Sequence, residues 1–176
     1  DTHVVRGLYP AEEGAEGLKA ALDELCQELT NSIERGCRTI ILSDRHSNAD
    51  LAPIPSLLLS AAVHHHLVRE KERSHVGLIV EAGDVREVHH LALLIGYGAA
   101  AVNPYLAFES AEDLARREWL VKVDPDNADA LWAQRRQLFF KPVAGYGAKA
   151  AYRGDKITRK AWADVTAGGF VAQALV

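Results

Sequence analysis

The sequence predicts an α/β fold in which repeated βα units form a parallel sheet, arranged like part of a TIM barrel. Short, mostly apolar runs occur at residues 38–42, 76–80 and 99–102. The first is rich in β-branched residues and the last consists of small ones, and each leads into a polar or glycine-containing segment typical of a strand end. Segments of helix length lie between these runs, with apolar residues spaced by three or four. Strands that are apolar throughout are buried on both faces, and connections of this length favour parallel pairing.

The first half of the chain alternates between strand and helix patterns. Gly36 ends the first helix pattern, and a proline lies in the first turn of the second. In chain order, we expect a strand at residues 3–9, a helix at 12–35, a strand at 38–42, a polar loop at 46–52, a helix at 55–73 and a strand at 76–80.

Residues 85–108 are the stretch that best defines this fold. Their apolar pattern predicts a helix from about Asp84 that stops at Gly96-Tyr97-Gly98, where the glycines allow the backbone to turn. A strand at residues 99–102 follows and ends at Asn103-Pro104, because proline cannot donate to a strand ladder. The stretch is therefore a helix that leads directly into a buried strand.

The last third of the chain has weaker patterns. We expect a helix capped by Glu109 or Ser110 that runs through Leu120, a turn at residues 124–127, and a helix from Ala130 to Phe140 that ends before Gly145-Tyr146-Gly147. Neither period persists over residues 148–176. The predicted organisation is a domain at residues 1–120 and a helical or irregular extension of it at residues 121–176.

Composition excludes several classes of protein. The 176 residues carry a formal net charge of −4 and form no basic stripe, so neither a nucleic acid nor an anionic membrane is an expected partner. The longest apolar run is too short to span a bilayer. Cys26 and Cys37 have no CxxC spacing, which argues against a disulfide framework or a thiolate metal site and favours a cytoplasmic protein. Because methionine is absent even from position 1, we expect a processed chain or a piece of a longer polypeptide.

The carboxyl ends of the predicted strands carry the candidate functional residues. In a parallel sheet, whether open or closed into a barrel, binding and reactive groups gather at these ends. The candidates for a strand-end or interface site are Ser43, Asp44, Arg45, Glu81, Asn103 and Tyr105. A structural ion pair or a loop cap is the default interpretation, because a serine and an aspartate without a neighbouring histidine do not form a catalytic triad.

Other motifs are better explained by structure than by chemistry. Five helix histidines are adjacent to one another in sequence, at 64–66 and 89–90, whereas metal-binding pairs on a helix lie three or four residues apart. We expect them to pack and to form hydrogen bonds within the helix layer. The Gly96-Tyr97-Gly98 segment runs from helix to strand, the reverse of a dinucleotide-binding loop. Both cysteines lie where inert burial is favoured over reactivity.

Several stretches resemble the central domain of the glutamate synthase large subunit, which lies between the glutaminase and flavin domains of that family. They are Ser43-Asp44-Arg45, residues 52–70 (APIPSLLLSAAVHHHLVRE) and residues 76–109 (VGLIVEAGDVREVHHLALLIGYGAAAVNPYLAFE). The similarity is nearly continuous over residues 11–120 and thins beyond them to Tyr152-Arg153-Gly154. Before that tripeptide, LWAQRRQLFFKPVAGYGAKA departs from the lysine-rich helix and Gly-Ile-Ser-Thr strand of the family.

The resemblance implies a place in an enzyme that makes L-glutamate from L-glutamine and 2-oxoglutarate. In that family an N-terminal cysteine releases ammonia, which travels through a tunnel to a domain where reduced FMN delivers hydride to 2-iminoglutarate, and an iron–sulfur cluster relays electrons. Residue 1 here is Asp1, and Cys26 and Cys37 do not match the cysteines that hold the cluster. The resemblance therefore implies that the isolated chain is not catalytic and holds no cofactor.

The expected role is a scaffold that docks the glutaminase and FMN domains and helps to wall the tunnel, with a small electron-donor subunit as a further candidate partner. Two alternatives come from the residues themselves. One is a free-standing half-barrel that binds a small anion or an amino acid through Arg45, Glu81 and Asn103. The other is a pure protein-interaction domain, which would expose a large apolar patch.

Overall fold

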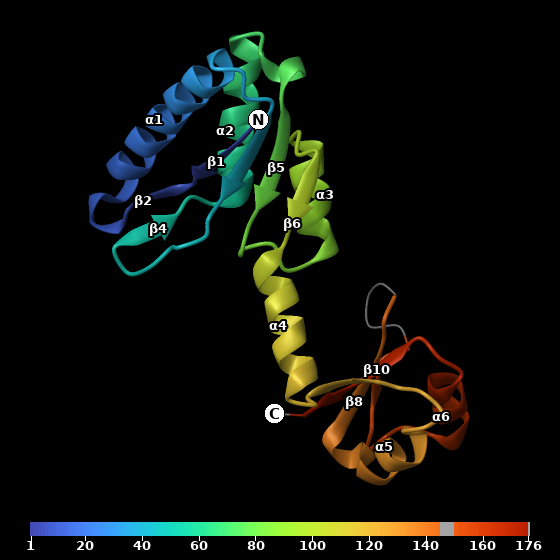
Figure 1. The fold of residues 1–176 in the computed structure, drawn as a ribbon. Coiled ribbons are helices and arrows are strands. Elements are labelled where there is room, and N and C mark those ends of the chain that lie inside the picture. Colours follow the sequence, from blue (N-terminus) through green and yellow to red (C-terminus); the bar gives the residue numbers. More distant parts are fainter. Residues whose placement is uncertain (145–149, 176) are drawn as a thin grey trace. The chain divides into compact units, whose positions relative to one another are not determined.

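The computed structural model describes residues 1–144 and 150–175, and these form two compact units, Asp1–Phe108 and Glu109–Val176 (Figure 1). The predicted break at Gly145-Tyr146-Gly147 lies outside the described residues. The domain boundary predicted at residue 120 stays a prediction.

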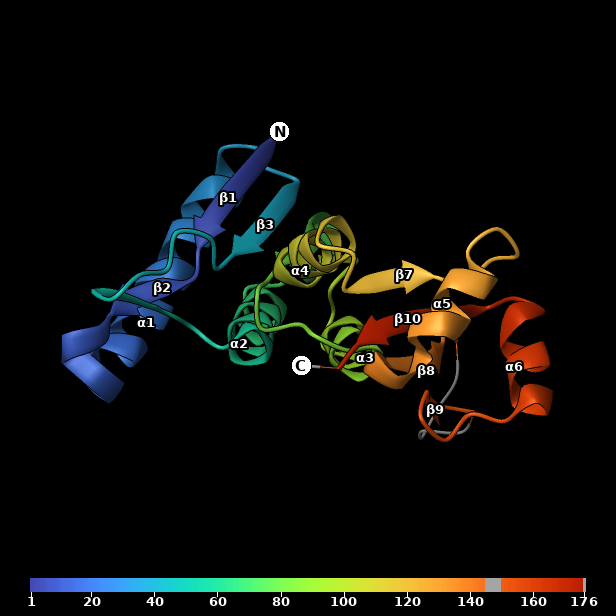
Figure 2. The same ribbon diagram turned by 90° about the horizontal axis from the view of Figure 1, so that it is seen from below.

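The first unit is built on a four-stranded parallel sheet whose strand order follows the order of the chain. The order is β1-β3-β5-β6, and every pairing is parallel; Figure 2 shows β1 and β3 pointing the same way. The strands are β1 (Thr2–Arg6), β3 (Thr39–Ser43), β5 (Gly77–Glu81) and β6 (Ala101–Asn103), and the helices between them are α1 (Gly14–Glu34), α2 (Ser56–Arg69) and α3 (Val88–Gly96). The predicted α/β class is confirmed, and the sheet does not close into a barrel.

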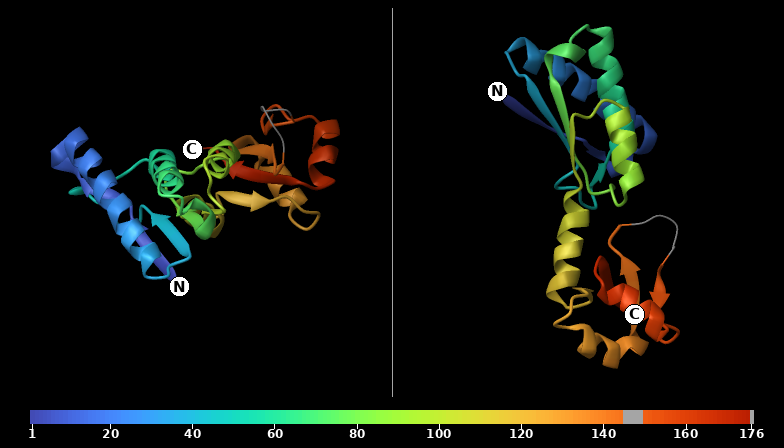
Figure 3. Two further views of the ribbon diagram at one scale, coloured as in Figure 1. Left: turned by 90° about the horizontal axis from the view of Figure 1, so that it is seen from above. Right: turned by 90° about the vertical axis from the view of Figure 1, so that its right-hand side faces the viewer.

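All three helices lie on one face of this sheet (Figure 3). Parallel strands joined through a helix make right-handed crossovers, and each crossover here moves to the next strand on the same side. Because the direction never reverses, the same face is covered each time. The first unit therefore has a helix-covered face and a helix-free face.

The hydrophobic core lies between the helices and the covered face. Val5, Leu42 and Val80 stand in one row across the strands and are at most 2% exposed. Leu29 of α1 and Val63 of α2 are fully buried against the same cluster. Burial of such aliphatic side chains contributes about 1.5–3 kcal/mol each, so this layer is a large source of stability for the unit.

A small antiparallel ribbon at the carboxyl edge of the sheet is absent from the sequence prediction. The strand expected at residues 3–9 is interrupted at Gly7, whose N–H donates to the carbonyl of Ser43 at 2.8 Å. The chain resumes as β2 (Leu8–Pro10), which pairs with β4 (Leu51–Pro53). The predicted polar loop at residues 46–52 is therefore wrong at Leu51 and Ala52, which belong to β4.

Two helices begin at positions other than those predicted. The helix expected from about Asp84 begins only at Val88, because Glu87 before it has an extended backbone, and Val85 is buried in the core. The helix expected to start at Glu109 or Ser110 and to reach Leu120 is α4 (Tyr105–Arg116). Its first turn follows Pro104, whose carbonyl accepts from the N–H of Phe108 at 3.2 Å.

The second unit contains an antiparallel sheet where the sequence indicated helical or irregular chain. The strand order is β7-β10-β8-β9. The elements are β7 (Leu120–Lys122), α5 (Ala128–Gln134), β8 (Leu138–Pro142), β9 (Tyr152–Arg153), α6 (Arg159–Thr166) and β10 (Phe170–Ala174). The helix predicted from Ala130 to Phe140 is correct only as far as Gln134, because Phe140 is fully buried in β8 at the centre of a separate core.

The amino edge of the parallel sheet is held by one arginine. Arg73, which lies between α2 and β5, donates through Nε to Nδ1 of His64 at 3.1 Å and through Nη2 to the carbonyl of Gly98. Burial, followed by the charge of Arg73 and that of His65, lowers the pKa of His64. A neutral His64 is the form whose Nδ1 can accept this hydrogen bond, so α2 and the turn after α3 are joined through the arginine.

We predict that Gly98→Ala destabilises the first unit by about 1–3 kcal/mol. Gly98 has φ of 99°, and a Cβ there would lie 2.5 Å from Nδ1 of His64, so the change adds backbone strain and displaces the arginine link. Equilibrium urea unfolding measures the loss.

Gly96→Ala is the matched control for this substitution. A Cβ at Gly96 meets no atom within 4 Å, and the residue is the last of α3, where alanine is compatible with helical geometry. The control should be neutral or slightly stabilising. Equal effects of the two substitutions would contradict the role given to Gly98.

Candidate functional site: the carboxyl edge of the parallel sheet

Strand register brings the predicted site residues together. Ser43 of β3 lies beside Glu81 of β5, and Glu81 lies beside Asn103 of β6. Arg45 and Tyr105 each follow two residues beyond a strand end. Because parallel strands end at the same edge, side chains that are far apart in sequence meet in one cluster.

Glu81 is the centre of this carboxyl-edge cluster, which consists of the six predicted residues. Its Oε2 accepts from the hydroxyl of Ser43 at 2.7 Å. Its Oε1 accepts from Nε of Arg45 at 2.9 Å and from Nδ2 of Asn103 at 3.3 Å. The side chain of Glu81 is 21% exposed, so these bonds are partly shielded from water. They join the carboxyl ends of β3, β5 and β6.

Arg45 and Asp44 extend the cluster toward the loop after β5. The guanidinium of Arg45 lies 3.8 Å from the centroid of the Tyr105 ring, a distance at which a cation and an aromatic face attract. Asp44 is only 8% exposed, and its Oδ2 accepts from the N–H of Gly83 at 2.7 Å. A Cβ on Gly83 would lie 3.0 Å from the Tyr105 hydroxyl, so this close packing favours glycine.

The environment of Glu81 favours its ionised form. Burial by itself would raise the pKa of the carboxyl, but the hydrogen bonds from Ser43, Arg45 and Asn103, together with the charge of Arg45, outweigh burial and lower the pKa. Glu81 is therefore an anion at neutral pH and is poorly suited to act as a general acid or base, which requires a pKa near the working pH.

The geometry of the cluster favours a structural role over ligand capture. The positive charge of Arg45 is engaged by Glu81 and by the Tyr105 ring, which weakens the hypothesis of a small-anion site. Ser43 donates its hydroxyl proton to a carboxylate of low pKa, so it lacks the basic partner that an activated nucleophile needs. Asp44 is an exception within the cluster, because its Oδ1 is buried without a hydrogen-bond partner among the described residues.

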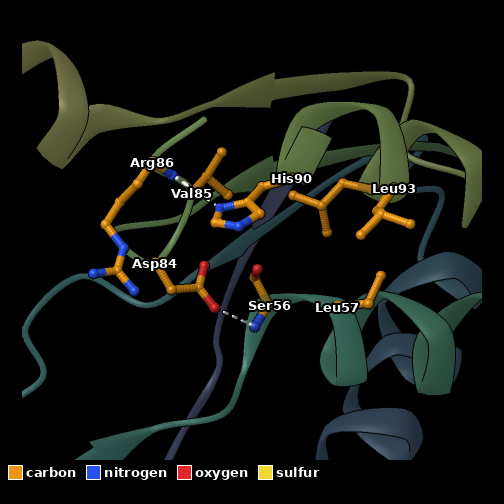
Figure 4. Close-up of a pocket in the computed structure, with 8 residues that line it drawn as sticks. Ser56, Leu57, Asp84, Val85, Arg86, His90 and Leu93 are labelled. Carbon is orange, nitrogen blue, oxygen red and sulfur yellow. Dashed lines mark hydrogen bonds between the residues drawn. The ribbon is translucent and has the colours of Figure 1, made fainter. Parts of the chain in front are cut away.

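A pocket of about 250 Å³ is lined by the start of α2, the segment that follows β5, and α3 (Figure 4). Asp84 accepts through Oδ2 from the N–H of Ser56 at 3.0 Å, so a carboxylate stabilises the positive end of α2. The N–H of Arg86 donates to Nδ1 of His90 at 3.2 Å. Leu57 and Leu93 form an apolar wall. The sequence analysis placed none of these residues in a site and assigned His90 to packing and hydrogen bonding. The strand-end rule, extended three residues beyond Glu81, would have found Asp84.

The histidines of the helix layer form separate contacts. His66 shares a hydrogen bond with the hydroxyl of Thr30 at 2.8 Å, which joins α2 to α1.

Within residues 1–144 and 150–175, no group of three histidine, cysteine or acidic side chains could hold a metal ion. Cys37 is buried, and burial raises the pKa of the Cys26 thiol, which lowers its reactivity. No helix in the part of the chain that the structure describes is long and apolar enough to cross a membrane.

The fold and the cluster define an open α/β domain whose strand-end residues bond to one another. A comparison with family models identifies the domain: the model of the glutamate synthase central domain matches residues 1–151. The chain therefore belongs to the glutamate synthase central domain family.

Curated relatives carry names that agree with the family. The chain is 47% identical to the NADH-type glutamate synthase of Schizosaccharomyces pombe over 105 residues, covering 60% of this chain and 5% of the relative. Over 94 residues it is 48% identical to the NADPH glutamate synthase large chain of Bacillus subtilis, covering 53% and 6%. Over 120 residues it is 40% identical to ferredoxin-dependent glutamate synthase 2 of Synechocystis, covering 66% and 7%. The matched regions are thus small parts of these relatives.

We predict that Glu81→Gln destabilises the chain by about 1–2 kcal/mol at neutral pH, because it removes the charge that Arg45 pairs with and the acceptor for one of the hydrogen bonds. The same change should alter the response to acid. A lowered pKa in the folded state gives stability that is present above about pH 4.5 and is lost as the pH falls below it. The variant should lack this part of the acid-induced loss in urea unfolding measured between pH 3 and 7, a range of about four units that covers the ordinary carboxyl pKa values.

Glu72→Gln provides the control, since Glu72 forms an exposed ion pair with His75 and such pairs contribute about 0–1 kcal/mol. It should leave the acid response nearly unchanged. If Glu81→Gln lost as much stability in acid as the unsubstituted chain, the protonation of Glu81 would not be a cause of the acid-induced loss of stability.

Proposed function

We propose that this chain is the central scaffold domain of a glutamate synthase polypeptide that makes L-glutamate from L-glutamine and 2-oxoglutarate. The observation that carries the proposal is the family match over residues 1–151. In this role the domain holds a glutaminase domain and an FMN domain in register, so that ammonia passes from one to the other, and the isolated chain performs no reaction.

The chemistry of the carboxyl-edge cluster supports a scaffold over a catalyst. Both oxygens of Glu81 accept hydrogen bonds from other members of the cluster. A group held in this way is rigid and charged, and it fixes the relative positions of the strand ends. Such rigidity suits a domain that keeps two distant active sites at a constant separation.

The cysteines of this chain do not fit the iron–sulfur cluster of the proposed parent enzyme. An iron–sulfur cluster takes several cysteine thiolates, whereas this chain has Cys26 in α1 and Cys37 buried before β3. We therefore place FMN and the iron–sulfur cluster in other domains of the polypeptide and assign no step involving them to this chain.

The partners follow from the same proposal. The glutaminase and FMN domains of the same polypeptide are the direct partners, and a small electron-donor subunit binds elsewhere in the assembly. The names of the relatives specify NADH, NADPH and ferredoxin, so membership of this family does not select the electron donor. We propose a cytoplasmic enzyme.

The test is the coupling of the two half reactions in the full-length polypeptide that carries this segment. Glu81→Ala should raise the ratio of glutamine hydrolysed to glutamate formed, because loosened strand ends disturb the register of the domains. Glutaminase activity and glutamate synthesis from added ammonia should each be retained.

Glu72→Ala, at an exposed surface pair, should leave the ratio unchanged. If Glu81→Ala instead abolished ammonia-dependent synthesis while the protein stayed folded, Glu81 would take part in catalysis, and the scaffold proposal would be wrong.

A further inference from the structure

The helix-free face of the parallel sheet carries an apolar row that crosses all four strands. Val4, Ile41, Ile79 and Ala101 are register neighbours from β1 to β6. With neighbouring strands about 4.8 Å apart, the row is about 14 Å wide. Beside it, toward the carboxyl edge, runs a polar row in the same register, formed by Arg6, Ser43, Glu81 and Asn103.

The apolar row is not part of the hydrophobic core. Side chains alternate between the two faces of a strand, and the burial of β3 and β5 follows this alternation, with every second residue fully buried under the helices. The four residues of the row are absent from the core cluster and from the side chains packed against it, as far as the described residues show. Val4 is 53% exposed.

A solvent-facing sheet surface usually carries polar residues in alternation with the buried ones. Here the alternating positions are Val4, Ile41 and Ile79, all β-branched and apolar. Strands that are apolar on both faces are typical of sheets that are covered on both sides. The helix-free face therefore has the composition of a surface that packs against protein.

We propose that the helix-free face is the surface on which a neighbouring domain of the same glutamate synthase polypeptide docks. This inference rests on the proposed function and adds the face and the residues that are used. The matched regions cover only 5–7% of the relatives named above, so a relative has more than nine-tenths of its chain available to cover this face.

A second copy of the chain is a poorer fit to the same surface. Two half-barrels could close only by joining β6 of one to β1 of the other, and β6 spans just Ala101–Asn103 before Pro104. Such a junction would have few hydrogen bonds, because proline has no N–H to extend it. Packing over the face needs no such junction, so a second copy could cover it only face to face, which would make the labelling of Val4→Cys depend on concentration.

The two rows specify the chemistry of the docking segment. Over the apolar row it must present aliphatic or aromatic side chains, since a charge buried there would have no partner. Over the polar row the negative charge of Glu81 is already paired with Arg45, so a neutral hydrogen-bonding segment fits better than a basic one. Arg6, exposed at the outer strand, provides a cation at one end for an acidic or carbonyl group.

Thiol labelling tests the proposal directly. Val4→Cys places a thiol on the helix-free face, and Val68→Cys places one on α2, where the native side chain is 49% exposed. Each is made in a Cys26→Ser background, both in the 176-residue chain and in the full-length polypeptide, and modification by a maleimide is followed by peptide mass spectrometry. Val4→Cys should label readily in the chain and about tenfold or more slowly in the full-length polypeptide.

The control thiol at Val68→Cys should label at similar rates in both. Equal rates for Val4→Cys in the two proteins, or equal slowing at both positions, would overturn the assignment of the face. If Val4→Cys labelled slowly in the 176-residue chain, and more slowly at higher protein concentration, a second copy would cover the face, and this result would also overturn the assignment. Failure of the full-length polypeptide to make glutamate would instead contradict the proposed function.

Discussion

The handedness of the crossovers is the constraint on which the first unit depends. Because each right-handed connection moves to the next strand on the same side, α1, α2 and α3 are confined to one face of the sheet. The core must then lie on that face, where Val5, Leu42 and Val80 are buried. The opposite face is left without a helix, and its apolar row is the surface that we propose another domain covers.

The two edges of the sheet are closed by different chemistry. At the amino edge Arg73 joins His64 to the backbone of Gly98, which fixes the turn between α3 and β6. At the carboxyl edge Glu81 collects hydrogen bonds from Ser43, Arg45 and Asn103. Parallel sheets commonly place reactive groups at the carboxyl edge. Here the polar groups bond chiefly to one another, which is the arrangement of a rigid support.

The spacing of apolar residues was enough to predict the helices and strands whose buried face follows a regular pattern in the sequence. It identified the parallel strands, the two long helices and the strand-end residues, because register at one sheet edge follows from parallel pairing. It failed where a distant contact decides the structure: Gly7 bonds to Ser43, and Phe140 fills a separate core as part of a strand. The pairing of Arg45 with Glu81, and with the Tyr105 ring, also depends on three-dimensional proximity that no spacing in the sequence encodes.

The central claim is that this chain supports the active sites of other domains without forming one itself. A cryo-electron microscopy map of the full-length polypeptide, with glutamine analogue and 2-oxoglutarate bound, tests it most directly. The account predicts another domain packed over Val4 and Ile41, with Glu81 still bonded to Ser43, Arg45 and Asn103. Substrate or flavin in contact with Glu81, or a helix-free face open to solvent, would contradict it.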